Sequence, residues 1–241
     1  MRGWWREMAQ LVLPVPCAGC GSGRVQLCEG CGEELWGGAP CRVRPSPEPV
    51  GLPAVHAAAA YADAVRAVLL AHKERGALGL AAPLGVALAG AVRAAVGPYG
   101  GGAGPLLLVP VPSARRVVRA RGHDATRRIA LAAARELRRT GTAARALPVL
   151  RQRGAVADQS GLGARQRLAN LAGALEVVPG AERLLGGGRA VLVDDLMTTG
   201  ASLVEAARAL SAARANGGGR FVRLSAAVVA SSSVSFEINR N

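Results

Sequence analysis

The sequence predicts an α/β protein in which a mostly parallel central sheet is flanked by helices, preceded by a small cysteine-rich module. The first observation behind this class is a series of short apolar segments that alternate with helical patterns, which is typical of a parallel sheet. The second is the segment 189–194, a β-branched apolar run of the kind that is buried on both faces. The third is a pair of Cys-x-x-Cys motifs near the amino terminus.

Composition sets the size of the core and the sign of the surface charge. The 241 residues fit one domain of ordinary size with an appendage. Half of the residues are apolar but only 3% are aromatic, so the core is expected to consist of Ala, Val and Leu. The formal net charge is +14, and every basic residue except Lys73 is arginine. This charge favours anionic partners in general, such as phosphates or nucleic acids, and not DNA in particular.

The four cysteines of the two motifs predict a structural zinc site. Their spacing suits four thiolates at the corners of a tetrahedron. The ligands would be Cys17, Cys20, Cys28 and Cys31. Two disulfides are the main alternative, and a redox pair is another, but a cytosolic chain without a signal sequence disfavours disulfides. The remaining cysteine, Cys41, is expected to be a bystander.

The chain divides into four segments by composition. Residues 1–36 are assigned to an N-terminal helix and the four-cysteine zinc module, 37–53 to a proline-rich linker, 54–230 to the main domain, and 231–241 to a tail without an assigned element. The apolar run at 11–13 is too short for a signal sequence. The apolar stretch 77–92 is shorter than a membrane span and indicates a buried helix. We therefore expect a cytoplasmic protein with no membrane span.

Within the main domain, each expected element has a local signature. Apolar runs predict strands over 54–61, 106–112, 147–150, 189–194 and 220–229, the second of them closed by prolines. Helical periodicity predicts helices over 63–72, 77–96 and 124–139. In the last of these, Ile129, Leu131 and Leu137 are expected to face inward.

Acidic and hydroxyl residues follow the strand at 189–194. Asp194 and Asp195 end this strand, and Thr198, Thr199, Gly200, Ala201 and Ser202 lead into a helix marked by Leu203, Ala206, Ala207 and Leu210. Free N–H groups at a helix start, assisted by hydroxyls, suit a phosphate. Two carboxylates suit the cis hydroxyls of a ribose, or a hydrated magnesium ion. The pattern predicts a site for a ribose 5-phosphate group at the edge where open α/β sheets bind ligands.

These residues resemble the 5-phosphoribosyl 1-pyrophosphate (PRPP) motif of type I phosphoribosyltransferases. The motif is an apolar strand, Asp-Asp, two variable residues, Thr-Thr-Gly, a small residue and Ser or Thr, and the chain matches all of it. The alternative is an ordinary strand–turn–helix, in which Asp-Asp is solvated and Thr199 or Ser202 caps the helix.

An arginine-rich segment follows the strand at 106–112 and is expected at the same edge of the sheet. Its residues are Ser113, Arg115, Arg116, Arg119 and Arg121. Guanidinium groups placed there can hold a pyrophosphate through charge-assisted bidentate hydrogen bonds. The alternative is a solvated charge run in an arginine-rich chain. His72 and His123 are interpreted as surface or helix-cap residues.

A wider resemblance covers nearly the whole chain. After the Cys-x-x-Cys pair come Tyr61, Lys73-x-Arg75-Gly76, Val109-Pro110-Val111-Pro112, Arg119-x-Arg121-Gly122, Arg151-x-Arg153, Gln159-Ser160-x-Leu162, Arg165-x-Arg167-x-x-Asn170-Leu171 and the Asp-Asp loop. This order is similar to the ComF family of competence-associated, phosphoribosyltransferase-like proteins. Members usually read Arg-Gly-Phe-Asn-Gln where this chain has Arg121-Gly122-His123-Asp124-Ala125. The resemblance therefore does not imply that this segment recognises a base or an amine.

The resemblance implies a type I phosphoribosyltransferase fold and a pentosyl-transfer activity on PRPP with Mg²⁺. Asp194 and Asp195 would then hold the ribose hydroxyls, the 198–202 loop the 5′-phosphate, and the arginines the leaving pyrophosphate. An alternative is a non-catalytic, zinc-containing module of the DNA-uptake machinery that binds single-stranded DNA or competence proteins. The scarcity of aromatic residues counts against base stacking in such a module.

Overall fold

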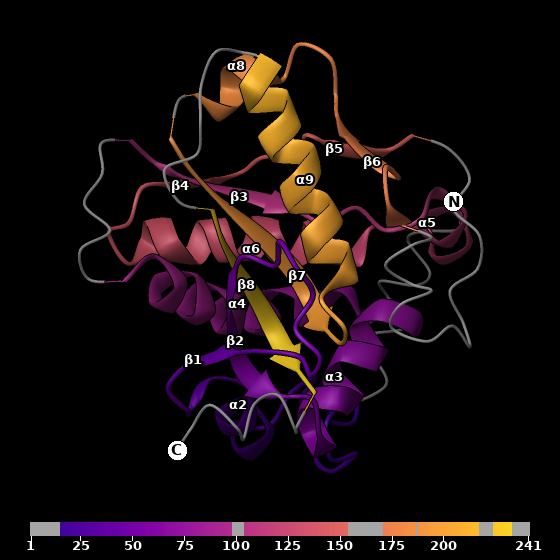
Figure 1. The fold of residues 1–241 in the computed structure, drawn as a ribbon. Coiled ribbons are helices and arrows are strands. Elements are labelled where there is room, and N and C mark those ends of the chain that lie inside the picture. Colours follow the sequence, from indigo (N-terminus) through magenta and orange to yellow (C-terminus); the bar gives the residue numbers. More distant parts are fainter. Residues whose placement is uncertain (1–14, 98–103, 154–170, 187, 217–223, 233–241) are drawn as a thin grey trace.

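The computed structural model describes residues 15–97, 104–153, 171–186, 188–216 and 224–232. Its centre is a six-stranded sheet with helices on both faces (Figure 1). The strand order is β1-β2-β8-β7-β3-β4. The strands are β1 (Cys41–Val43), β2 (Ala54–Ala60), β8 (Ser225–Ser231), β7 (Arg189–Met197), β3 (Leu106–Pro110) and β4 (Ala144–Ala146). All neighbours are parallel except β1, which runs antiparallel to β2. The predicted α/β class with a mostly parallel sheet is confirmed.

One layer of helices covers the first face of the sheet. It contains α3 (Asp63–Glu74), the short η1 (Leu78–Leu80), α4 (Ala81–Val96) and α6 (Ala125–Arg139), with α2 (Glu29–Trp36) packed beside them. The buried side chains of this layer are mainly Ala, Val and Leu, as the composition predicts. Leu35 of α2 lies in the same apolar cluster, so the cysteine-rich module packs on the main domain.

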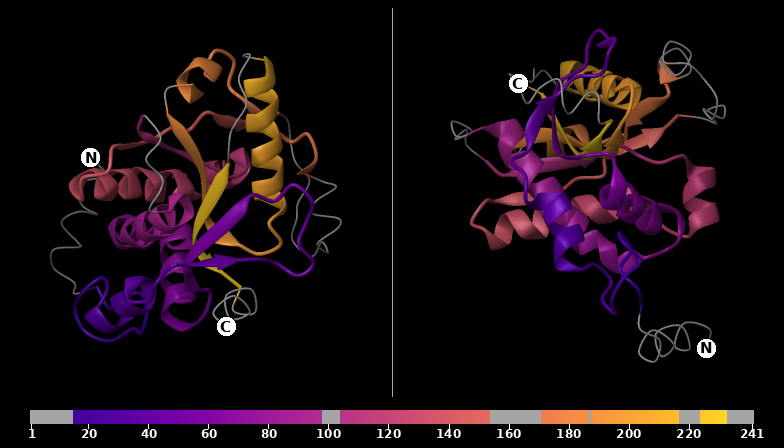
Figure 2. Two further views of the ribbon diagram at one scale, coloured as in Figure 1. Left: turned by 60° about the vertical axis from the view of Figure 1, so that its left-hand side comes forward. Right: turned by 90° about the horizontal axis from the view of Figure 1, so that it is seen from below.

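The second face is covered by α9 (Ala201–Asn216), together with α8 (Glu182–Leu185) and the antiparallel pair of β5 (Leu150–Gln152) and β6 (Leu175–Val177) (Figure 2).

A buried carboxylate of α9 binds the backbone of β6. Glu205 accepts a hydrogen bond from the backbone N–H of Leu175 at 2.9 Å and from Arg208 Nε at 2.7 Å. Burial alone raises the pKa of Glu205, but these donors outweigh it and hold that pKa below its usual value.

The helical run from Leu78 to Val96 is long and apolar enough, by length and composition, to cross a membrane. The sequence prediction for 77–92 placed it below that length. In the structure this run packs against α6 and the sheet, and Leu84, Leu88 and Val92 are fully buried in the shared apolar cluster. The core therefore accounts for the buried apolar residues of this run, while Leu78 and Val86 are exposed.

Several sequence predictions differ from the structure. Residues 41–43, inside the predicted linker, form the edge strand β1. The arginine-rich segment, to which no helix or strand was assigned from the sequence, contains the helix α5 (Arg115–Arg121). Leu131 is 51% exposed, because α6 turns Ile129, Ala130, Ala133, Ala134 and Leu137 inward. The short strands β4 and β6 were not predicted. The predicted N-terminal helix, the start of the strand at 220–229 and most of the tail lie outside the described residues.

The contact between α4 and α6 requires a glycine. A Cβ atom at Gly85 would lie 2.5 Å from Ala132 Cβ and 2.8 Å from its carbonyl carbon. We expect Gly85→Ala to lower the free energy of unfolding by about 1–3 kcal/mol, because the two helices would have to separate. Urea unfolding of purified protein measures this change.

Gly90→Ala is the matched control, since a Cβ there meets only Pro40 Cγ at 3.4 Å. A helix-interior alanine at that position should be neutral or stabilising by about 0.5–1 kcal/mol. Equal destabilisation by both substitutions would contradict the close α4–α6 contact.

Candidate functional site

Asp194 and Asp195 lie within the last four residues of the strand β7 and contact different elements. Successive side chains of a strand point to opposite faces. Val191 and Val193 pack in the cluster of α3, α4 and α6, whereas Ala190 and Leu192 pack in the cluster of α9. Toward the end of β7 this alternation is not kept, since Leu196 packs in the cluster of α3 and Met197 in that of α9. Asp194 lines a cavity with the start of α9 and contacts Thr126 of α6, whereas Asp195 pairs with Lys73 of α3.

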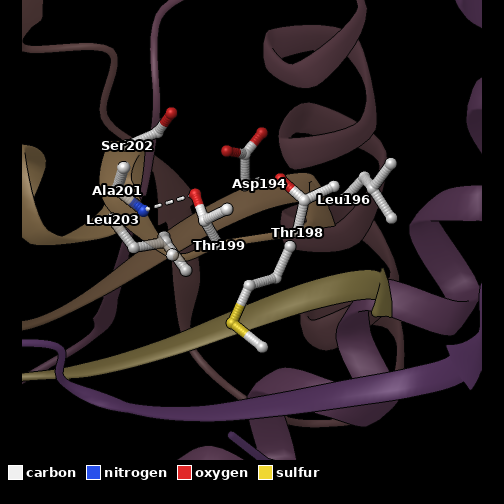
Figure 3. Close-up of a pocket in the computed structure, with 9 residues that line it drawn as sticks. Asp194, Leu196, Thr198, Thr199, Ala201, Ser202 and Leu203 are labelled. Carbon is white, nitrogen blue, oxygen red and sulfur yellow. Dashed lines mark hydrogen bonds between the residues drawn. The ribbon is translucent and has the colours of Figure 1, made fainter. Parts of the chain in front are cut away.

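A cavity of about 230 Å³ lies at the carboxyl end of β7. Its lining consists of Asp194, Leu196, Met197, Thr198, Thr199, Gly200, Ala201, Ser202 and Leu203. Figure 3 shows the Asp194 carboxyl group between the side chains of Ser202 and Leu196. The predicted 198–202 loop and Asp194 are thus brought together, and Asp195 does not line this cavity.

The loop leads directly into the helix α9. The backbone N–H of Val204 donates to Gly200 O at 3.0 Å, which begins the hydrogen bonding of the helix. The N–H groups just before Val204 therefore have no acceptor within the helix. Thr199 Oγ1 accepts a hydrogen bond from the Ala201 N–H at 3.5 Å (Figure 3). Gly200 has a φ of +77°, which strongly favours glycine. The loop therefore presents N–H groups and hydroxyls at the start of a 16-residue helix.

The environment of Asp194 disfavours its ionised form. Burial raises the pKa of the Asp194 carboxyl well above its usual value, and the neighbouring Asp195 charge raises it further. Lys73 and the N–H of Asp195, which donates to Asp194 Oδ1 at 2.8 Å, act in the opposite direction but do not cancel the effect. Thr126 Oγ1, from the first turn of α6, donates to the same oxygen at 3.5 Å.

Asp195 forms an ion pair that the sequence analysis did not assign to the site. Its Oδ2 lies 2.7 Å from Lys73 Nζ, at the last turn of α3. Burial lowers the pKa of Lys73, but the charges of Asp195 and Asp194 outweigh burial and raise it overall. Motif matching noted Lys73 only within the wider resemblance. Its status as the single lysine was a signal that could have drawn attention to it.

The predicted arginines lie on or near α5, and none of the described residues lining the cavity is an arginine. Arg115, Arg116 and Arg119 are exposed. Arg121 is bound to Glu74 of α3, with Nε donating to Oε2 at 2.9 Å and Nη2 contacting Oε1. Ser113 lies between β3 and α5 and is half-buried. The four arginines therefore do not form one cluster around the cavity.

The segment that departs from the ComF pattern has a structural role here. Asp124 is the N-cap of α6, where its Oδ1 accepts a hydrogen bond from the N–H of Arg127 at 3.0 Å. His123 Nε2 lies 3.1 Å from the carbonyl oxygen of His72, and the two imidazole centroids are 5.8 Å apart. These residues join the start of α6 to the end of α3.

The four predicted zinc ligands form one cluster. The thiol sulfurs of Cys17, Cys20, Cys28 and Cys31 all lie within 4.8 Å of one another. The Cys28 sulfur is 3.6 Å from that of Cys17 and 3.7 Å from that of Cys20. A tetrahedron with metal–sulfur bonds of about 2.3 Å has edges of about 3.8 Å, so the cluster is compatible with a structural metal site such as zinc.

The electrostatics of the cluster differ between its cysteines. Burial opposes ionisation of Cys17, but N–H donors outweigh it and lower its pKa to about 6; the N–H of Cys28 lies 3.3 Å from this sulfur. The N–H of Ser22 lowers the pKa of Cys20. Burial raises the pKa of Cys31, and the neighbouring thiols add to this. Since metal ligands bind as thiolates, the lowered values assist the first steps of metal capture.

The cluster packs directly on α3. Cys17 and Cys31 share a buried apolar contact with Ala64 in the first turn of α3. A Cβ atom at Gly19 would lie 2.6 Å from Cys31 Sγ and 3.0 Å from Ala64 Cβ, so only glycine permits this approach. The cysteine cluster and Lys73 are therefore attached to opposite ends of one helix.

No family model matches the chain, and a search of curated proteins finds no match. Function is therefore inferred from the residues and their geometry.

We expect the purified chain to carry one tightly bound metal ion at the cysteine cluster. Cys28→Ser should remove it and lower the midpoint of thermal unfolding, because the metal stabilises the packing of the module on α3. Elemental analysis and thermal unfolding with and without a chelator measure both effects. Cys41→Ser, outside the cluster, is the control and should keep the metal. A metal-free protein whose unfolding is insensitive to a chelator would contradict this assignment.

The raised pKa of Asp194 predicts a pH-dependent stability. In the unfolded chain this carboxyl loses its proton near its ordinary pKa, whereas the folded protein retains the proton to higher pH. Stability conferred by this group therefore falls as pH rises through that window, by about 1.4 kcal/mol per unit of pKa difference. We expect Asp194→Asn to raise the unfolding midpoint more at pH 7 than at pH 4. The exposed Asp63, changed to Asn, provides the comparison and should show a smaller difference between the two pH values.

Proposed function

We propose that the chain binds PRPP with magnesium at the carboxyl end of β7 and acts as a phosphoribosyltransferase, or senses PRPP through the same site. One observation carries this proposal. A single cavity places the Asp194 carboxyl group opposite a hydroxyl-bearing loop at the start of a long helix. A ribose with a 5′-phosphate needs both features, a carboxylate for its hydroxyls and N–H groups for its phosphate.

The 5′-phosphate would lie at the loop of residues 198–202. N–H groups that precede the helical ladder have no intrahelical acceptor, and the dipole of α9 favours an anion at this end. The hydroxyls of Thr198, Thr199 and Ser202 add donors around the same cavity. The positive φ of Gly200 keeps the backbone turned tightly enough for a small anion.

The ribose would lie against Asp194. A carboxylate accepts hydrogen bonds from two neighbouring hydroxyls, which suits the cis pair of a ribose. In pentosyl transfer, positive charge develops on the ribose ring as pyrophosphate leaves. That charge would favour the ionised form of Asp194, which burial otherwise disfavours, and the carboxylate would in turn stabilise the charge. The protein's contribution would then be positioning and electrostatics, with no covalent intermediate required.

The pyrophosphate would extend toward α5. Strand β3 is the parallel neighbour of β7, with Pro110 paired to Val193, so α5 begins at the same edge of the sheet as the loop. The exposed Arg115, Arg116 and Arg119 are the arginines closest in sequence to that edge. The polar side chains that line the cavity all offer oxygen atoms, which fits the preference of magnesium. Magnesium carried on the pyrophosphate would neutralise charge on the leaving group.

We further propose that the metal at Cys17, Cys20, Cys28 and Cys31 is zinc and that its role is structural. All four positions of the tetrahedron are filled by protein sulfurs, so none remains for a substrate. The metal would hold residues 17–31 in the conformation that packs on Ala64.

We expect calorimetric titration with PRPP and magnesium to show binding to the wild-type chain, and Asp194→Asn to weaken it by about tenfold or more. A hydrogen bond to a charged group contributes about 1.5–3 kcal/mol, which corresponds to this loss. Asp63→Asn removes the same charge from an exposed position on α3 and should bind as the wild type does. Unchanged affinity in Asp194→Asn would show that the site is assigned wrongly.

Turnover is tested separately from binding. The protein is incubated with PRPP, magnesium and a panel of nucleobases and amines, and pyrophosphate release is followed. Release with one acceptor, abolished by Asp194→Asn, supports a transferase. Binding without release across the panel supports a sensor.

A further inference from the structure

The single lysine of the chain lies at the second carboxylate of the site. The chain has 30 basic residues, and all of them are arginine except at position 73, which carries the one side-chain ammonium group. Its Nζ lies 2.7 Å from Asp195 Oδ2, and the two side chains are 31% and 5% exposed. This is a partly buried ion pair between α3 and β7, so it differs from the solvated ion pairs of a protein surface.

The charges around this pair come from three elements. Lys73 is acted on by Asp195 and Asp194 from β7 and by Arg121 from α5. Two adjacent carboxyl groups repel each other when both are ionised, and one of them then takes up a proton or moves. A compact ammonium at Asp195 offsets that repulsion, and neither Lys73 nor Asp195 lines the cavity. An arginine would bring a wider planar group to the same contact.

We propose that Lys73 is a positioning residue of the ligand site: its ammonium holds Asp195 on the α3 side of β7 and leaves Asp194 as the carboxyl group that meets the ribose. This inference rests on the proposed function and adds a residue to it. Lys73 acts through Asp195 and touches no ligand. Without Lys73, a nearly buried carboxylate loses its partner directly beside Asp194, and the tip of β7 rearranges.

A double-mutant cycle tests this role with PRPP and magnesium as the probe. Lys73→Met keeps the aliphatic stem and removes the charge, and it should weaken binding by about tenfold or more, because breaking a buried pair leaves a charge without a partner. Adding Asp195→Asn removes that charge, so the double variant should recover to within about threefold of the wild type. Lys73→Arg should bind between the wild type and Lys73→Met.

Arg66→Met removes a cation from the exposed side of the same helix and should leave affinity unchanged. Thermal unfolding of each variant identifies loss of the fold. If Lys73→Met does not fold, the double variant and Lys73→Arg still decide the question, since both are expected to fold and bind. Wild-type affinity in Lys73→Met, or no recovery in the double variant, overturns the proposal.

A spectroscopic measurement separates this inference from the proposed function. Reductive ¹³C-methylation keeps the lysine charge and labels only Lys73 and the terminal amine. Asp195→Asn should lower the titration midpoint of the Lys73 signal, and Asp63→Asn should not. Absence of PRPP binding in the wild type overturns the proposed function, and the positioning role with it. An unshifted Lys73 midpoint in Asp195→Asn overturns the Lys73–Asp195 interaction whatever ligand is bound.

Discussion

The site depends on the different contacts of two adjacent carboxyl groups near the end of β7. This strand is buried on both faces, so each carboxyl group enters a packed environment. Asp194 lines the cavity at the start of α9 and contacts Thr126 of α6, and burial opposes its charge. Asp195 enters the layer of α3, where only a cation makes its burial tolerable. The two adjacent aspartates therefore differ: Asp194 is the one that would meet the proposed ligand, and Asp195 pairs with Lys73 of α3.

The end of α3 fixes the geometry around this tip. Three consecutive residues contact three partners: His72 accepts from His123 through its carbonyl oxygen, Lys73 pairs with Asp195, and Glu74 binds Arg121. The other end of the same helix carries Ala64, on which the cysteine cluster packs. A helix is a stiff element, so a shift of the cluster would be transmitted to all three contacts. The cysteine module therefore packs on the helix that also contacts the proposed ligand site, and it is not separated from the main domain.

The sequence predicted the elements whose signal lies within one contiguous segment. Apolar runs located β2, β3 and β7, and helical periodicity located α3, α4 and α6. The three-residue strands β4 and β6 are too short to show a period. The arginine-rich segment was interpreted by its charge alone, and no element was predicted there, although arginine has good helix propensity and residues 115–121 form the helix α5. Within the site, the 194–202 motif was visible because it is contiguous. The Lys73–Asp195 pair was not, because tertiary packing alone brings α3 to β7.

The predicted linker also belongs to the architecture of the site. A Cβ atom at Gly200 would lie 2.9 Å from Leu52 Cδ1 and 3.6 Å from Pro49 Cγ, so the linker packs directly against the 198–202 loop. Prolines suit this position, because a segment with few accessible conformations loses little entropy when it packs. The loop is thus supported by the linker on one side, while Lys73 of α3 secures the strand tip that leads into it. Both supports precede β3 in sequence. The amino-terminal part of the chain therefore shapes a site whose recognisable motif lies near the carboxyl terminus.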